Sequence, residues 1–89
     1  MKVIYKYPIH LTGMEYINSY EGAEVLSVGY DPSGVPCVWA MVDTAKPQYP
    51  LNVLCLGTGW EVDMSFDYKF IGTINDGPYM WHIFQVKGD

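Results

Sequence analysis

The stretch AEVLSVGYDPSGVPCVWAMVD, residues 23–43, decides the fold because two strand-like segments flank a tight turn. Leu26, Val28 and Tyr30 fall on one side of the first segment, with the two-residue period of a β-strand. The sequence DPSG, residues 31–34, has proline and glycine at positions that reverse turns favour. A second apolar segment follows at once. The stretch therefore predicts an antiparallel β-hairpin.

The same signals recur in the rest of the chain. YKFIGTI and YMWHIFQV, residues 68–74 and 79–86, flank the turn sequence NDGP and predict a second hairpin. Shorter strand signals lie at residues 2–8, 14–20 and 51–57, each bounded by proline, glycine or other turn-forming residues.

Helical signals are weak. The best helical segment is a single turn at residues 11–16, because glycine, proline or β-branched residues interrupt every longer window. We therefore predict one domain over residues 1–89. Its class is all-β: a small antiparallel β-sandwich or half-open barrel of six or seven short strands.

The composition is that of a folded protein with an excess of large rings. The chain has 89 residues, of which 49% are hydrophobic, 16% aromatic and 17% charged. A domain of this size buries only about 60% of the surface that its unfolded chain exposes. A thin core cannot hide fourteen aromatic rings, so we expect some of them to face a partner.

The charge pattern narrows the choice of partner. The net charge is −5, and all five basic residues are lysines. Without arginine, the chain lacks the usual device for gripping phosphates and base edges, and we expect no duplex nucleic acid as a partner. The sequence also has no 18-residue apolar window and no signal-peptide-like run near its start. We therefore expect no membrane partner and a location in the cytoplasm.

Three segments are apolar on both faces: residues 36–42, 51–57 and 79–86. In a sandwich each strand should show one face to the core and one to water. An uncovered apolar patch above ~300–600 Å² invites association. We therefore predict a homo-oligomer, most simply a two-fold dimer. The alternative is a barrel that closes more fully and hides both faces. The expected interface residues are Val38, Leu54, Met80, Phe84 and Val86.

No motif in the sequence fixes a chemistry, and we expect a protein without catalytic residues. His82 lies in the last strand-like segment, and acid–base catalysis would need a second titrating group within hydrogen-bond reach. The sequence cannot place Glu61, Asp63 or Asp76 beside it. A small hydrolase that uses His82 is kept as an alternative.

We also expect neither a metal nor a cofactor. Cys37, Cys55, His10 and His82 do not have the spacing of a metal site. The two cysteines lie in apolar runs, which favours buried free thiols, and a bridge between them stays open as an alternative.

The candidate binding residues combine a glycine turn, aromatic rings and lysines. The Gly57-Thr58-Gly59 backbone could offer N–H groups to an anion, and aromatic rings stack nucleobases or fill protein interfaces. The predicted binding residues are Tyr5, Lys6, Trp39, Gly57, Thr58, Gly59, Trp60, Lys69, Trp81 and His82.

The order of the segments IYKYPI, EGAEVLSV, GVPCVWAMVD, LGTG, FIGTI and WHIF resembles a family of short uncharacterised proteins of tailed phages and prophages. The resemblance covers nearly the whole chain. In that family a histidine often follows the Gly-Thr-Gly, whereas Trp60 stands here, so a role of that histidine would not carry over. The resemblance implies a phage accessory gene and no transferable catalytic residue, and the expected location is then the host cytoplasm.

These observations favour a non-catalytic phage accessory protein that acts by binding and antagonises a bacterial defence system. Its partner would be a host protein or a small nucleotide signal held between subunits, and the missing arginines favour the protein. A minor virion or assembly component is the other alternative.

Overall fold

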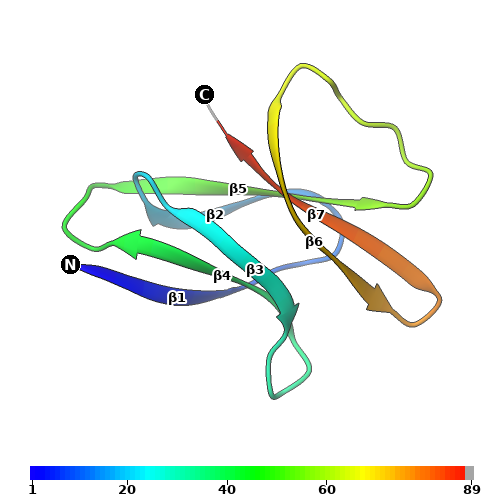
Figure 1. The fold of residues 1–89 in the computed structure, drawn as a ribbon, viewed down its shortest axis with the longest axis horizontal. Helices are drawn as coiled ribbons and strands as arrows, with labels where there is room; N and C mark the ends of the chain where they lie inside the picture. The colour runs from blue at the N-terminus through cyan, green and yellow to red at the C-terminus, as the bar shows by residue number, and fades with distance from the viewer. Residues whose placement is uncertain (88–89) are drawn as a thin grey trace.

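The structure, a computed structural model, describes residues 1–87, which form seven strands and no helix. The strands are β1 (Lys2–Pro8), β2 (Gly13–Tyr20), β3 (Glu24–Tyr30), β4 (Pro36–Asp43), β5 (Gln48–Gly57), β6 (Asp67–Asp76) and β7 (Tyr79–Lys87). They form two antiparallel sheets with the orders β1-β4-β3 and β2-β5-β7-β6, and no closed barrel (Figure 1). The predicted all-β class and strand number are confirmed. The predicted helical turn at residues 11–16 is wrong, because β2 already begins at Gly13.

The hairpin predicted first is present as β3 and β4, and Asp31 organises its turn. The Gly34 N–H donates to the Asp31 carbonyl (2.8 Å), and the Asp31 carboxylate accepts from the backbone N–H groups of Ser33 and Val35 (both 2.9 Å). Lys6 donates to the same carboxylate at 2.9 Å. These hydrogen bonds, with that from Lys6 first, hold the pKa of Asp31 below its usual value.

The second predicted hairpin is present as β6 and β7. The two strands pair as far as Asp76 and Tyr79, which leaves a loop of two residues, Gly77 and Pro78. Gly77 has a φ of +59°, and a two-residue hairpin loop favours glycine at its first position for this reason.

β3 and β6 each contain a β-bulge. The register shifts between Val25 and Ser27 in β3 and between Phe70 and Gly72 in β6. The alternation predicted along β3 is therefore wrong at the bulge: Val25 is buried, whereas both Leu26 and Ser27 are exposed. An extra residue in one strand reverses the side on which the following side chains lie.

The bulged strands β3 and β6 are edge strands of different sheets, and they lie against each other along a line that we call the β3–β6 seam. Side chains bridge it. Lys69 Nζ donates to the Glu24 carboxylate (3.1 Å) and to the Val25 carbonyl (3.3 Å). Tyr30 Oη donates to the Asn75 carbonyl (2.6 Å). The seam joins the sheets without a backbone ladder.

The core lies between the sheets and is made of small and β-branched side chains. Its buried members are Ile9, Ala23, Val25, Val38, Ala40, Val42, Leu51, Val53, Cys55 and Ile83. Three residues predicted for an oligomer interface are therefore placed wrongly. Val38 belongs to this core, and Leu54 and Val86 are also covered within the chain, with 8% and 6% of their surface exposed. A contact with a second chain needs surface that these residues no longer have.

Both cysteines are free and buried, so the alternative of a bridge between Cys37 and Cys55 is wrong. Burial raises the pKa of the Cys55 thiol to about 11 and also raises the pKa of the Cys37 thiol. At neutral pH both are uncharged and pack as small apolar groups.

Candidate functional site

The outer face of the β2-β5-β7-β6 sheet carries side chains in rows, because directly paired residues point to the same side. One row consists of Tyr16, Asn52, Val86 and Tyr68, and the next of Met14, Leu54, Phe84 and Phe70. The Phe84 ring lies edge to face with Tyr68 and Phe70, with centroid distances of 5.8 and 5.4 Å. These two rows are therefore largely apolar, and Asn52 is the one side-chain amide in them.

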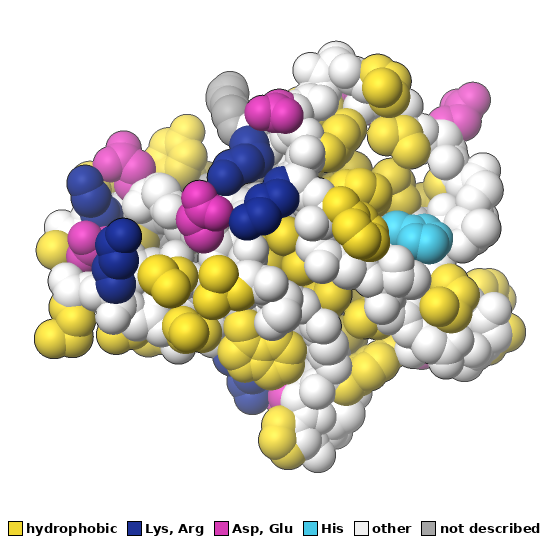
Figure 2. Space-filling view, viewed as in Figure 1, with side chains coloured by type: hydrophobic (Ala, Val, Ile, Leu, Met, Phe, Trp, Pro, Cys, Tyr) yellow, Lys and Arg dark blue, Asp and Glu magenta, His cyan; other side chains and the backbone are white. Residues whose placement is uncertain are grey.

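Much of the aromatic surface of the chain is exposed. Eight of the fourteen aromatic side chains are exposed: Tyr5, Tyr16, Tyr30, Tyr49, Trp60, Phe66, Phe70 and Tyr79. Figure 2 shows hydrophobic side chains gathered over β6, β7 and the loop between β5 and β6. The expectation that one copy cannot hide all its rings is confirmed for this structure.

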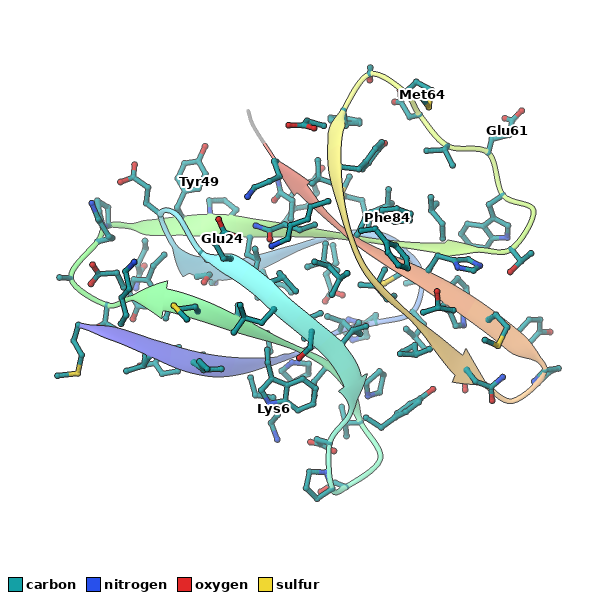
Figure 3. All side chains as sticks on the ribbon, viewed as in Figure 1. Lys6, Glu24, Tyr49, Glu61, Met64 and Phe84 are labelled. Atoms are coloured by element: carbon teal, nitrogen blue, oxygen red, sulfur yellow. The ribbon has the colours of Figure 1, made fainter. Side chains whose placement is uncertain are left out.

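The loop of residues 58–66 connects β5 to β6 and projects beyond the sheet (Figure 1). Its start and end are held by hydrogen bonds. The Ser65 N–H donates to the Asp63 carboxylate (2.9 Å), and Tyr68 Oη donates to the Asp63 carbonyl. Met64 lies on the outer rim of the loop (Figure 3) and is 85% exposed. The apolar residues of the loop all face solvent: Trp60, Val62, Met64 and Phe66.

The loop begins with a tight turn that folds Trp60 back onto β5. The Trp60 N–H donates to the Gly57 carbonyl (3.1 Å), and Gly59 has a φ of +91°. The Trp60 ring then lies so close to Gly57 that a Cβ there would come within 2.9 Å of Trp60 Nε1. Trp60 packs edge to face on Trp81, with a centroid distance of 5.3 Å and an interplanar angle of 87°. Glycine at position 57 is what makes this tryptophan pair fit.

The tryptophan pair forms part of an open pocket of about 690 Å³. Its lining comes from the end of β5, the start of β7 and the loops next to them: Gly57, Thr58, Trp60, Pro78, Tyr79, Met80 and Trp81. We call it the tryptophan pocket. None of these residues is charged. Trp81 Nε1 is shielded from solvent and has no hydrogen-bond partner within residues 1–87.

His82 lies beside this pocket, on the outer face, between two hydroxyl groups. Its Nε2 is 2.8 Å from Thr58 Oγ1, and its Nδ1 is 3.1 Å from Thr73 Oγ1. A hydroxyl can both donate and accept, so this arrangement satisfies either neutral form of the ring. A carboxylate that orients the ring is not among its partners in the part of the chain that the structure describes.

Six of the ten predicted binding residues come together at this end of the molecule: Gly57, Thr58, Gly59, Trp60, Trp81 and His82. The other four do not. Lys6 is paired with Asp31, and Lys69 with Glu24. Trp39 lies on β4 in the other sheet, where its ring packs over Gly29, and Tyr5 lies on β1.

A second hollow involves residues that the sequence did not mark as a site. It is an open groove of about 580 Å³, lined by Met14, Tyr16, Tyr49, Pro50, Asn52, Ser65, Phe66, Asp67, Val86 and Lys87. We call it the Asn52 groove. Asn52 interrupts the apolar run LNVLCL, and this interruption was the signal available in the sequence.

Residues 1–87 contain no group of three or more histidine, cysteine, aspartate or glutamate side chains that could hold a metal ion. The same residues form no helix that is long and apolar enough to cross a membrane.

The fold and the two hollows define a small two-sheet β-protein whose hollows are lined in part by aromatic rings. The chain belongs to the family described as a domain of unknown function, DUF7352, whose model matches residues 1–89. No curated protein and no solved structure matches the chain.

Proposed function

We propose that this protein acts by binding and not by catalysis, as a phage accessory protein whose tryptophan pocket takes a side chain of a host protein. Binding would block the host protein and so antagonise a bacterial defence system. The observation that carries the proposal is the lining of the pocket: two tryptophans, a tyrosine, a methionine and a proline around about 690 Å³. Tryptophan and tyrosine are the residue types that concentrate in interface hot spots.

The absence of charge in this pocket favours a protein partner over a nucleotide. A phosphate needs a cation or several backbone donors. The two lysines expected to meet it, Lys6 and Lys69, are paired with Asp31 and Glu24 away from the pocket. In the turn itself, the Trp60 N–H already donates to Gly57. An apolar or aromatic side chain fits this lining better than a phosphorylated ligand does.

The surroundings of His82 favour binding over hydrolysis. A histidine base is usually oriented by a carboxylate and placed beside an activated nucleophile. Here both ring nitrogens contact threonine hydroxyls, Thr58 and Thr73. Turnover of an ester or phosphoester by the wild type that is lost in His82→Ala would argue for hydrolysis instead.

We also propose self-association through the part of the outer face around Phe70, Met80 and Phe84, none of which lines the Asn52 groove. The residues that support it differ from most of those first expected: Phe70 is 57% exposed and Met80 43%, and Phe84 packs against Phe70. Sedimentation equilibrium should show a dimer for the wild type and a monomer for Phe70→Ser. A monomeric wild type at high concentration would remove this part of the proposal.

The host-protein proposal can be tested with a photo-crosslinking amino acid at position 79. Tyr79 lines the pocket and is 63% exposed, so the label replaces a surface side chain. The crosslinked host protein is then purified and titrated with the unlabelled chain. We expect Trp60→Ala to weaken its binding at least about tenfold, as for a hot-spot aromatic. Tyr5→Ala, far from the pocket, is the matched control. Equal affinities for wild type and Trp60→Ala would refute the proposal.

A further inference from the structure

The Asn52 groove and the tryptophan pocket lie at opposite ends of β5. The groove uses Tyr49, Pro50 and Asn52 near the start of the strand, whereas the pocket uses Gly57 at its end. A smaller hollow of about 230 Å³ adjoins the groove and shares Asn52 with it. The groove lies within the range of ~300–1,000 Å³ typical of small-molecule sites.

Asn52 has an unusual environment. It pairs with Tyr16 on one side and with Val86 on the other, and Leu54 follows on the same face. Its Oδ1 is shielded from solvent and accepts no hydrogen bond within residues 1–87. Leaving a shielded acceptor unpaired costs free energy, and such a group in a native protein calls for an explanation such as a ligand. A ligand in the groove would supply it if the amide turns about its terminal torsion, which is soft in asparagine, so that Oδ1 meets a donor of the ligand.

Three aromatic rings line the groove together with this amide. Tyr16 and Tyr49 come from β2 and β5, and Phe66 comes from the last part of the 58–66 loop. All three are exposed, at 70%, 56% and 47%. Rings that flank an amide can hold a planar heterocycle by stacking, and such stacking is tolerant of which base is bound.

The charges at the groove point to a neutral ligand. Lys87 and Asp67 both line it, and they pair with each other in the β6–β7 register. Lys87 Nζ is also 3.3 Å from the Glu24 carboxylate. The groove is thus lined by one lysine and one aspartate, which give no net attraction for phosphates, and the chain as a whole carries a charge of −5.

We propose that the Asn52 groove binds a neutral nucleoside whose base carries an amino group beside a ring nitrogen, as adenosine does. The Asn52 side chain presents an acceptor and a donor side by side, and this pair matches the amino group and ring nitrogen of adenine. Oδ1 accepts from the amino group, and Nδ2 donates to the ring nitrogen. Tyr16 and Phe66 stack on the base. The site is separate from the tryptophan pocket and does not depend on the function proposed for it.

The test is an NMR titration of the ¹⁵N-labelled full chain with adenosine up to millimolar concentration. We expect the largest shifts at the Asn52 side-chain amide and at the backbone of Tyr16 and Phe66. N6,N6-dimethyladenosine is the matched ligand control, because it keeps the ring but has no donor for Oδ1. We expect it to bind at least about tenfold more weakly, the loss of one good hydrogen bond to a base edge.

Two variants separate this site from the other. Asn52→Leu should lose the response to adenosine, while Trp60→Ala should keep it, because Trp60 lies outside the groove. Tyr16→Ala should weaken binding by about tenfold through lost stacking. No shifts with adenosine, equal binding of the dimethylated ligand, or an unchanged response in Asn52→Leu would each overturn the proposal. So would a response to N-acetyltyrosinamide with none to adenosine, since that would assign the groove to a peptide.

Discussion

Gln85 and Val25 lie in different sheets and share a buried hydrogen bond, in which the Val25 N–H donates to Gln85 Oε1 at 2.8 Å. Gln85 Nε2 also donates to the Ala23 carbonyl at 2.9 Å, and only 5% of Gln85 is exposed. The Gln85 amide thus pairs with the N–H of Val25 in β3 and with the carbonyl of Ala23, the residue before β3. Neither backbone group has a ladder partner in the other sheet. Gln85 therefore connects the two sheets in the interior of the β3–β6 seam, and the Lys69–Glu24 pair connects them at the surface.

We expect Gln85→Met to lower the free energy of unfolding by roughly 2–4 kcal/mol, because two buried backbone groups lose their partners while the side-chain volume is kept. Urea unfolding followed by far-UV circular dichroism measures this. Gln48→Met, an exposed position at the start of β5, should change stability by less than about 0.5 kcal/mol. Similar unfolding midpoints for the two variants would show that the Gln85 bridge is dispensable.

Gly57→Ala should displace the Trp60 ring, because the new Cβ would lie 2.9 Å from Trp60 Nε1 and 3.0 Å from Cε2. We expect a changed near-UV circular dichroism spectrum and at least about tenfold weaker binding of the host partner, with the far-UV spectrum unchanged. Gly29→Ala is the matched control, since its Cβ would meet Trp39 at an ordinary 3.8 Å. A near-UV spectrum that stays like the wild type in Gly57→Ala would contradict the tryptophan pairing.

Stability should fall in alkaline solution because of Cys55. Its pKa rises from 9.0 in the unfolded reference to about 11 in the folded chain, because burial disfavours the thiolate. Between these values the unfolded chain loses the proton and the folded chain keeps it. The free energy of unfolding therefore decreases as the pH rises through this window, by up to about 1.4 kcal/mol per pH unit. Cys55→Ala should show a shallower decrease than the wild type in urea unfolding between pH 8 and pH 11. Parallel curves would mean that other groups cause the loss.

Asn52→Leu should stabilise the chain by about 1 kcal/mol, because it replaces a shielded, unpaired oxygen with an apolar group among apolar neighbours. For a domain of this size that corresponds to a rise in Tm of roughly 4–8 °C. Asn18→Leu on β2, where the side chain is exposed, should give no such rise. A lower Tm for Asn52→Leu would show that the amide has a structural partner. A gain in stability that removes nucleoside binding is the pattern expected of a functional residue.

Local sequence was sufficient to predict both hairpins, since the turn residues around Asp31 and Gly77 lie between two strand signals that are adjacent in the chain. It could not show that β1 pairs with β4 and β2 with β5, because pairing over long separations depends on the whole set of strands. For the same reason the sequence could not show what covers the strands that are apolar on both faces. Leu54 and Val86 are apolar on an outer face, yet neighbours in the same chain cover them.

The site was predictable where its signal was local. The glycine turn and its tryptophan are adjacent in sequence, and Trp81 and His82 follow each other in β7. The sequence could not show that Lys6 and Lys69 pair with Asp31 and Glu24, because these carboxylates lie 25 and 45 residues away. The run around Asn52 is apolar on both faces apart from this residue, and only the paired rows of the sheet and the lining of the groove show that the amide lies near aromatic rings.

The β3–β6 seam also decides where fibril growth can start. A sheet recruits a further strand only at an edge that is flat and free, and here one edge of each sheet is bulged and turned toward the other. Strand addition is therefore restricted to β1 and β2. β1 contains Lys2, Lys6 and Pro8, which discourage it, whereas β2 contains no lysine and no proline. Any ordered polymer of this protein should begin with β2.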